Sequence, residues 1–184
     1  MSVKNSLLAI LAAEPTHGYG LKSSFEKTTG GAWPLNVGQV YTTLGRLERD
    51  GLVQPEGTGD GPRQTWRITA LGREALESWY ENPVELDPPS RDELAIKVLL
   101  AAAAEEVDVT RIIDRQRVVT MERLQQLTRH KQKADPDKEL PWLLLVDAFI
   151  LKTKAEITWL DLCEERLRQR DKSAKSAKSE TGQA

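Results

Sequence analysis

The sequence predicts a mainly α-helical protein with two parts: three helices, a β-hairpin and a fourth helix come first, and long helices follow. Three observations support this prediction. Apolar residues recur with helical spacing over most of the 184 residues. Two short stretches between residues 52 and 69 have the composition of β-strands, and a turn with glycines and a proline separates them. A proline-rich stretch then divides the chain.

The first two helices are marked by their apolar faces and by the residues that end them. The three leucines of SLLAILAAE share one helical face, and Pro15 ends that helix. THGYGLKSSFEKTTGG predicts a second helix, in which Leu21 and Phe25 are four residues apart. Its final pair of glycines suits the left-handed backbone that commonly ends a helix.

The third helix is predicted in NVGQVYTTLGRLERDG, where Asn36 is a suitable N-cap and Gly51 a suitable end. Four apolar residues cluster within about 80° on a helical wheel and form its core face. These are Val37, Val40, Leu44 and Leu47. Gly38 and Gly45 are poor helix formers. Either close packing within the domain or the close approach of another surface explains them.

A hairpin and a fourth helix complete the first part. LVQPEG and QTWRIT predict its two strands, and Thr69 is a suitable N-cap for the helix ALGREALESWYE. The apolar stripe of this helix contains Leu71, Ala75, Leu76 and Trp79. Three helices with a tight connection between the second and third, followed by a two-stranded wing, define a winged helix-turn-helix. We predict this domain over residues 1–82.

The C-terminal part begins after a stiff, proline-rich linker at residues 83–89. A helical domain is predicted over residues 90–171, and a capping box formed by Ser90 and Glu93 opens it. Two long helices joined by a short loop are expected to pack antiparallel. The low-complexity segment 172–184 is predicted to be disordered.

The last long helix carries apolar residues at alternating three- and four-residue spacing, the pattern of a helix-packing seam. Further apolar residues, among them Trp142, Phe149 and Trp159, lie outside that seam. A helix that is apolar on more than one face has more than one neighbour, so we predict a homodimer. The predicted dimerisation residues are Leu143, Val146, Ile150, Ile157, Leu160 and Leu167.

Composition argues against several classes of protein. One cysteine, Cys163, and two distant histidines, His17 and His130, predict neither a disulfide framework nor a metal site. No glycine-rich phosphate loop or catalytic constellation is found, so we expect neither an enzyme nor a cofactor. The longest apolar runs fall short of the roughly 20 residues of a membrane span, and no signal peptide is recognised. We expect a soluble, cytoplasmic protein that does not bind membranes.

The polar face of the third helix predicts contact with double-stranded DNA. Its acidic residues, Glu48 and Asp50, lie at the C-terminal end, whereas the N-terminal half of such a helix approaches base edges. The net charge of −2 argues against a strongly basic, nonspecific binder, so any positive surface must be local. The candidate DNA contacts are Gln39, Thr42, Thr43 and Arg46 on this helix, with Lys4, Lys22, Arg63 and Gln64 from the first helices and the wing.

Several stretches resemble the PadR-type transcriptional regulators. LLAILAAEPTHGYGLKSSFE, GQVYTTLGRLERDGLV and RQTWRITALGREALESW are similar to that family's first two helices, its recognition helix, and its wing with the following helix. SRDELAIKVLL resembles the start of the C-terminal region in the longer, virulence-activator-like subgroup. The resemblance implies a homodimeric repressor that binds a palindromic operator. It also implies that Tyr41 lies near the DNA backbone.

Release of the operator by a small aromatic or cationic effector is a further implication of the resemblance. Trp142, Phe149 and Trp159 are the candidate lining of an effector pocket, with simple packing of the dimer seam as the alternative. A second functional hypothesis is a winged-helix module that binds a protein partner and no DNA, which the slightly acidic net charge favours.

Overall fold

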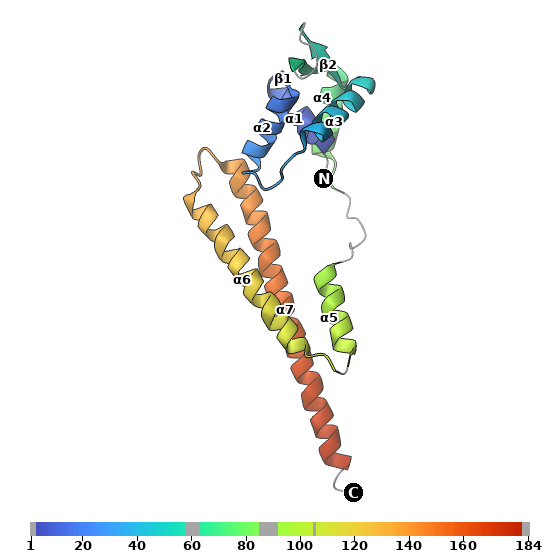
Figure 1. Cartoon of the computed structure of the whole chain (residues 1–184), viewed down its shortest axis with the longest axis vertical. Helices are drawn as coiled ribbons and strands as arrows, with labels where there is room; N and C mark the ends of the chain where they lie inside the picture. Colours follow the sequence, from blue (N-terminus) through green and yellow to red (C-terminus); the bar gives the residue numbers. More distant parts are fainter. Residues whose placement is uncertain (1–2, 58–62, 85–91, 105, 182–184) are drawn as a thin grey trace. The chain divides into compact units, whose positions relative to one another are not determined.

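The protein forms two units, residues 1–86 and 87–184, each with its own hydrophobic core (Figure 1). We describe them from a computed structural model. It describes residues 3–57, 63–84, 92–104 and 106–181, with side chains up to residue 173. The mainly helical class predicted from the sequence is confirmed. Most of the predicted linker, and Ser90 of the predicted capping box, lie outside the described residues.

The N-terminal unit packs four helices against a small sheet. Its elements are α1 (Val3–Ala13), β1 (Thr16–His17), α2 (Gly18–Thr28), α3 (Val37–Arg49), β2 (Val53–Glu56), β3 (Thr65–Ile68) and α4 (Ala70–Glu81). The most deeply buried side chains of its core are Leu7, Leu8, Leu11, Leu21, Val40, Leu44 and Leu47. The apolar faces expected for the first three helices therefore meet in one core.

The sheet has the antiparallel order β1-β3-β2 among the described residues, so the two-stranded wing predicted from the sequence gains a third strand. In β1, Thr16 pairs with Trp66 and His17 with Thr65. Two residues are too few to show the alternating pattern by which a strand is recognised in a sequence. The β1 pairing ties the connection between α1 and α2 to the wing.

The predicted apolar faces extend beyond the core at two places. Val37 is 40% exposed because it occupies the first position of α3, where the helix has only begun to cross the core. On α4, Leu71 and Trp79 are 53% and 40% exposed, and the helix packs instead through Gly72 and Leu76. The prediction that Val37 belongs to the core face was therefore wrong, and the apolar stripe of α4 is only partly buried.

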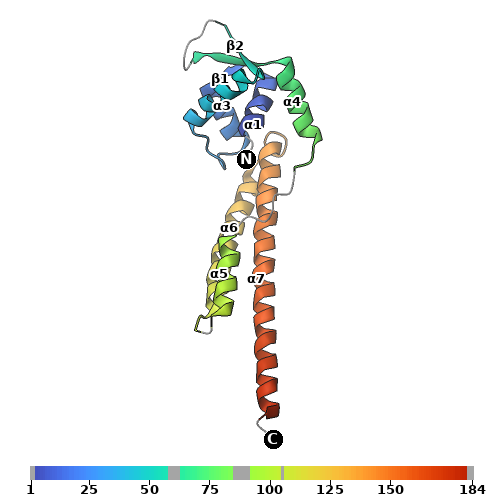
Figure 2. The ribbon, with the colours of Figure 1, turned by 90° about the vertical axis from the view of Figure 1, so that its right-hand side faces the viewer.

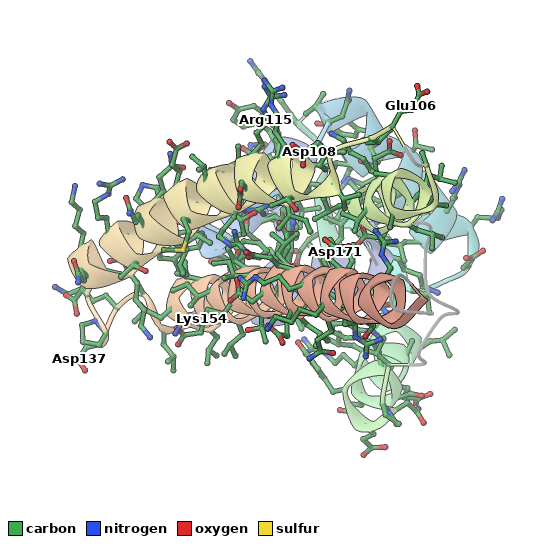
Figure 3. All side chains as sticks on the ribbon, turned by 90° about the horizontal axis from the view of Figure 1, so that it is seen from below. Glu106, Asp108, Arg115, Asp137, Lys154 and Asp171 are labelled. Atoms are coloured by element: carbon green, nitrogen blue, oxygen red, sulfur yellow. The ribbon has the colours of Figure 1, made fainter. Side chains whose placement is uncertain are left out.

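The C-terminal unit consists of α5 (Glu93–Ala103), α6 (Val109–Lys133) and α7 (Leu140–Thr181). Asp92 caps α5 by accepting a hydrogen bond from the Ala95 N–H at 3.0 Å, in place of the predicted Ser90. The helices α6 and α7 run antiparallel and side by side, as predicted, and side chains fill the space between them (Figure 3). Arg115 lies on the side of α6 that points away from α7.

Polar contacts fix the pairing of α6 with α7. The carboxylate of Glu156 accepts hydrogen bonds from the Thr120 hydroxyl at 2.6 Å and the Gln116 amide at 3.1 Å. One turn further, Arg117 forms ion pairs with Asp161 at 3.1 Å and Glu164 at 2.5 Å. Thr120 is only 3% exposed, so its hydroxyl needs an internal acceptor, which Glu156 provides.

Half of the predicted dimer seam is buried inside the chain. Val146 and Leu160 have no exposed surface, and Ile150 is 8% exposed. The remaining members, Leu143, Ile157 and Leu167, are half-buried. An apolar repeat shows that a helix packs along one face but not which helix covers it. Here the cover comes from the same chain, so Val146 and Leu160 are not available to a second copy.

The helix α7 continues to Thr181, into the segment 172–184 for which the sequence predicts disorder. Alanine, lysine and glutamate, which make up much of this segment, are good helix formers. Low complexity was therefore a poor indication of where the helix ends.

Candidate DNA-binding surface

The helix α3 is closed at both ends by local hydrogen bonds. The Asn36 side chain accepts from the Gly38 N–H at 2.8 Å, as expected for an N-cap, and Gly51 follows the helix with φ +71°. A residue with a side chain would be strained at that angle. Figure 2 shows α3 on one side of the N-terminal unit, below the sheet, and α4 on the other.

The side chains on α3 that are predicted to contact DNA differ in exposure and in whether their polar groups are already hydrogen-bonded. Gln39, Thr42 and Arg46 are exposed, and Tyr41 and Thr43 are half-buried. The side chains of Gln39 and Arg46 form no hydrogen bond or ion pair with any other residue that the structure describes. They are therefore available for hydrogen bonds to an external partner.

The two threonines use their hydroxyl protons within the helix. The Thr42 hydroxyl donates to the Gly38 carbonyl at 2.9 Å, and the Thr43 hydroxyl donates to the Gln39 carbonyl at 2.7 Å. A threonine hydroxyl has one proton to donate. Neither residue therefore offers a free hydroxyl donor on this surface.

Tyr41 is positioned by a glycine of α2. A Cβ atom added to Gly18 would lie 2.6 Å from two carbons of the Tyr41 ring and 2.9 Å from its oxygen. The ring also packs against the core of the unit. Because Gly18 has no side chain, the Tyr41 ring can pack directly against the backbone of α2. Gly18 belongs to the HGYG stretch of the sequence, but its contact with α3 is visible only in three dimensions.

Gly45 lies on the exposed face of α3 and has open space around it. A Cβ atom added there would meet no other atom within 4 Å, and one added to Gly38 would meet only the Asn36 oxygen at 3.2 Å. Close packing within the domain therefore does not explain Gly45.

The basic residues around α3 are partly neutralised within the unit. Lys22 pairs with Glu26 at 3.3 Å, Arg49 with Asp50 at 3.3 Å, and Arg67 with Glu56. By contrast, the predicted contacts Lys4, Arg46 and Arg63 are exposed and have no partner within the described parts of the chain. Lys27 on α2 is also exposed and has no side-chain partner among the described residues, so the positive charge that is free to meet phosphates comes mainly from these four residues.

The predicted contact Gln64 has a structural role in the wing. Its amide nitrogen donates to the backbone oxygen of Thr65 at 2.7 Å and to that of Glu56 at 3.3 Å. These bonds connect β3 with β2, so the Gln64 amide nitrogen is engaged in the hairpin.

The three aromatic residues predicted to line an effector pocket do not come together. Trp142 and Trp159 lie on the continuous helix α7 and are separated along its axis by roughly 25 Å, at 1.5 Å per residue. Trp159 packs in the core of the C-terminal unit beside Cys163. Trp142 and Phe149 are two turns apart, or roughly 10 Å, and are both half-buried. At most these two can share one pocket.

Burial raises the pKa of the Cys163 thiol, and nearby Arg166 opposes the shift. A raised pKa leaves less reactive thiolate at neutral pH than in an unfolded chain. We expect Cys163 to react with iodoacetamide more slowly than a peptide cysteine at pH 8. Its rate should still be rising with pH above the ordinary thiol pKa of 9.0. Unfolding in guanidinium should restore the peptide rate, and equal rates in the folded and unfolded protein would contradict this expectation.

Among the described residues, two other features are absent. No group of three or more His, Cys, Asp or Glu side chains is arranged to hold a metal ion among them. No helix in the described ranges is long and apolar enough to cross a membrane.

The arrangement of four helices, a β-wing and an exposed polar third helix defines a winged helix-turn-helix protein. Residues 7–78 match the profile of the transcriptional regulator PadR-like family. Residues 90–168 match the profile of the virulence activator alpha C-terminal domain. The chain therefore carries a PadR-like domain followed by a virulence activator alpha C-terminal domain, and in this it is similar to the longer PadR-type transcriptional regulators.

Several known proteins are similar to this chain at low sequence identity. A probable transcriptional regulator of Mycobacterium tuberculosis is 24% identical over 191 residues, which cover 92% of this chain and 100% of that protein. Bacillus subtilis PadR with operator DNA has a TM-score of 0.68 at 18% identity, covering 88% of this chain and 96% of that one. PadR with p-coumaric acid has a TM-score of 0.71 at 17% identity, covering 88% and 95%.

The Vibrio cholerae virulence activator AphA has a TM-score of 0.63 at 21% identity, covering 91% of this chain and 98% of that one. At such identities the solved structures establish a common fold. The residues that bind DNA or an effector in this chain must be argued from its own surface.

Proposed function

We propose that this regulator is a homodimeric repressor that binds a palindromic operator and releases it when a small molecule or another signal acts. DNA binding is assigned to residues 1–82 and assembly to residues 90–171, in the cytoplasm. The main support is the exposed face of α3, where Gln39 and Arg46 have free hydrogen-bonding groups. Such side chains form paired hydrogen bonds to adenine and guanine in the major groove.

The charge distribution supports specific rather than general binding. The first turn of α3 contains no acidic residue, and three exposed cations, Lys4, Arg46 and Arg63, are free of internal partners in the described structure. A small number of phosphate contacts positions a protein on DNA, whereas base contacts select the sequence. The overall charge of −2 is compatible with this division.

Arg46→Ala is expected to weaken binding to the specific operator by about 1 to 3 kcal/mol if Arg46 reads a base. The measurement is an electrophoretic mobility shift with DNA from the promoter upstream of the chain's own gene. Arg73→Ala is a matched control, because Arg73 is an exposed arginine on α4. The control should leave affinity unchanged.

Two results would contradict these assignments. If Arg46→Ala kept full affinity and sequence preference, Arg46 would not be a base contact. If wild-type protein retarded no DNA at low salt and micromolar concentration, the DNA-binding function would fail. A winged-helix module that binds a protein partner would then be the better description.

The homodimer is best supported by a second row of residues on α7. They follow one another at alternating four- and three-residue spacing, and all are exposed within the chain. The row consists of Leu144, Ala148, Leu151, Ala155, Thr158 and Leu162. Leu144 and Leu151 are 63% and 65% exposed. Alternating large and small side chains at this spacing let two helices pack closely. We assign the dimer contact to this row, which lies opposite the seam buried under α6.

An effector is proposed on the basis of the p-coumaric acid complex of Bacillus subtilis PadR. In this chain Trp142 and Phe149 are the remaining aromatic candidates, since Trp159 belongs to the core. Titration of tryptophan fluorescence with small aromatic acids and cations tests the proposal. A flat response with unchanged DNA binding would leave these two residues with a packing role only.

A further inference from the structure

We propose that Thr42 recognises a thymine of the operator through its methyl group and not through its hydroxyl. This inference rests on the DNA-binding function proposed above. Thr42 is exposed on α3, and along the helix it lies between Gln39 and Arg46, the two residues with free polar groups. The part of the Thr42 side chain that faces solvent therefore helps to determine which base pair fits between the contacts of Gln39 and Arg46.

The hydroxyl of Thr42 is directed toward its own helix. It donates its single proton to the Gly38 carbonyl at 2.9 Å. Thr43 does the same with the Gln39 carbonyl and is half-buried as well. Thr42 is thus the threonine that reaches solvent, with its donor already used.

The methyl group of Thr42 occupies a different staggered position on Cβ from the hydroxyl. It is therefore free of the hydrogen bond to Gly38 and available for apolar contact. In the major groove, thymine presents a C5-methyl group, with which a threonine methyl makes a favourable contact. Hydrogen-bonded recognition then falls to Gln39 and Arg46, and apolar recognition to Thr42.

The hydroxyl oxygen could contribute in one other way, because it keeps a lone pair that can accept a hydrogen bond from an adenine or cytosine amino group. Two substitutions separate this role from that of the methyl. Thr42→Val removes the hydroxyl and keeps the methyl and the shape, whereas Thr42→Ser keeps the hydroxyl and removes the methyl. The exposure of Thr42 means that neither change disturbs the core.

The experiment uses the full-length protein and an operator selected from random duplexes by the wild type. Each thymine of one half-site is then replaced by deoxyuridine, which lacks the C5-methyl. At one position, loss of that methyl should weaken wild-type binding about four-fold. This is the change in Kd expected when one buried methyl group is lost from an apolar contact. Thr42→Val should keep both the affinity and the four-fold preference. Thr42→Ser should bind the thymine operator about four-fold more weakly and show no preference at that position.

Each alternative outcome has a separate meaning. If Thr42→Ser retains the preference for thymine, or if Thr42→Val loses affinity while Thr42→Ser does not, the methyl contact is wrong. Wild-type binding that is indifferent to every thymine methyl overturns this inference and leaves the DNA-binding function intact. If the selection yields no bound duplex, the DNA-binding function itself fails. Circular dichroism of both variants should match that of the wild type.

Discussion

Gly72→Ala should destabilise the N-terminal unit by about 3 kcal/mol or more, because the added carbon has no space. A Cβ atom on Gly72 would overlap the backbone oxygen of Leu52 and lie 2.7 Å from a side-chain carbon of Ile68. Backbone at the start of the wing cannot move aside as a flexible side chain can. Hydrogen exchange of amides in α1 to α4 measures the stability of this unit separately, and operator binding should weaken in parallel.

Gly45→Ala is the matched control for this prediction. The new methyl would meet no atom within 4 Å, and alanine is favoured over glycine inside a helix by up to about 1 kcal/mol. The N-terminal unit should therefore keep or gain stability. Equal destabilisation by the two substitutions would show that steric overlap at Gly72 is not the cause.

Leu151→Glu should convert the proposed dimer into a monomer without unfolding the chain. Leu151 is 65% exposed and lies in the exposed row of α7, so in a monomer the charge would remain in water. In the proposed dimer the same charge would be buried against a second copy, which is costly without a partner. Sedimentation velocity at micromolar concentration should show half the wild-type mass, and circular dichroism should show the same helix content.

Val118→Glu provides the comparison, because Val118 is an exposed apolar residue of α6, at 58% exposure. It should leave the mass unchanged. If Val118→Glu dissociates the protein and Leu151→Glu does not, the dimer contact lies on α6 instead of α7. If the wild type is itself monomeric at this concentration, the homodimer is wrong.

The sequence predicted best those features that depend on neighbouring residues. The Asn36 cap, the end of α3 at Gly51, and the order of helices and hairpin are local, and all are found in the structure. The polar face of α3 was also predicted, since helical periodicity places Gln39 and Arg46 away from the core. Their contact with DNA stays a prediction.

The features that the sequence did not reveal depend on which segments of the chain are in contact with one another. The seam of α7 was recognised as a packing face, but its partner turned out to be α6 of the same chain. The exposed row is hard to recognise in the sequence, because half of its members are alanine or threonine. The contact between Gly18 and Tyr41 joins two helices, and no sequence spacing encodes it. The Thr42 hydroxyl could be assigned only once its distance to Gly38 was known.

One residue, Thr69, ties the end of α3 to the start of the wing and the start of α4. Thr69 donates to the Gly51 carbonyl at 2.7 Å and accepts from the Gly72 N–H at 3.0 Å, while its own N–H donates to Leu52 at 3.1 Å. The end of α3, the start of the wing and the start of α4 therefore meet at one residue. A regulatory signal that arrives through α4 would have to tilt this whole block rather than bend the wing alone. If the protein is a dimer that releases DNA in response to an effector, as proposed, that signal would act by changing the spacing and angle between the two DNA-binding units, with each unit unaltered.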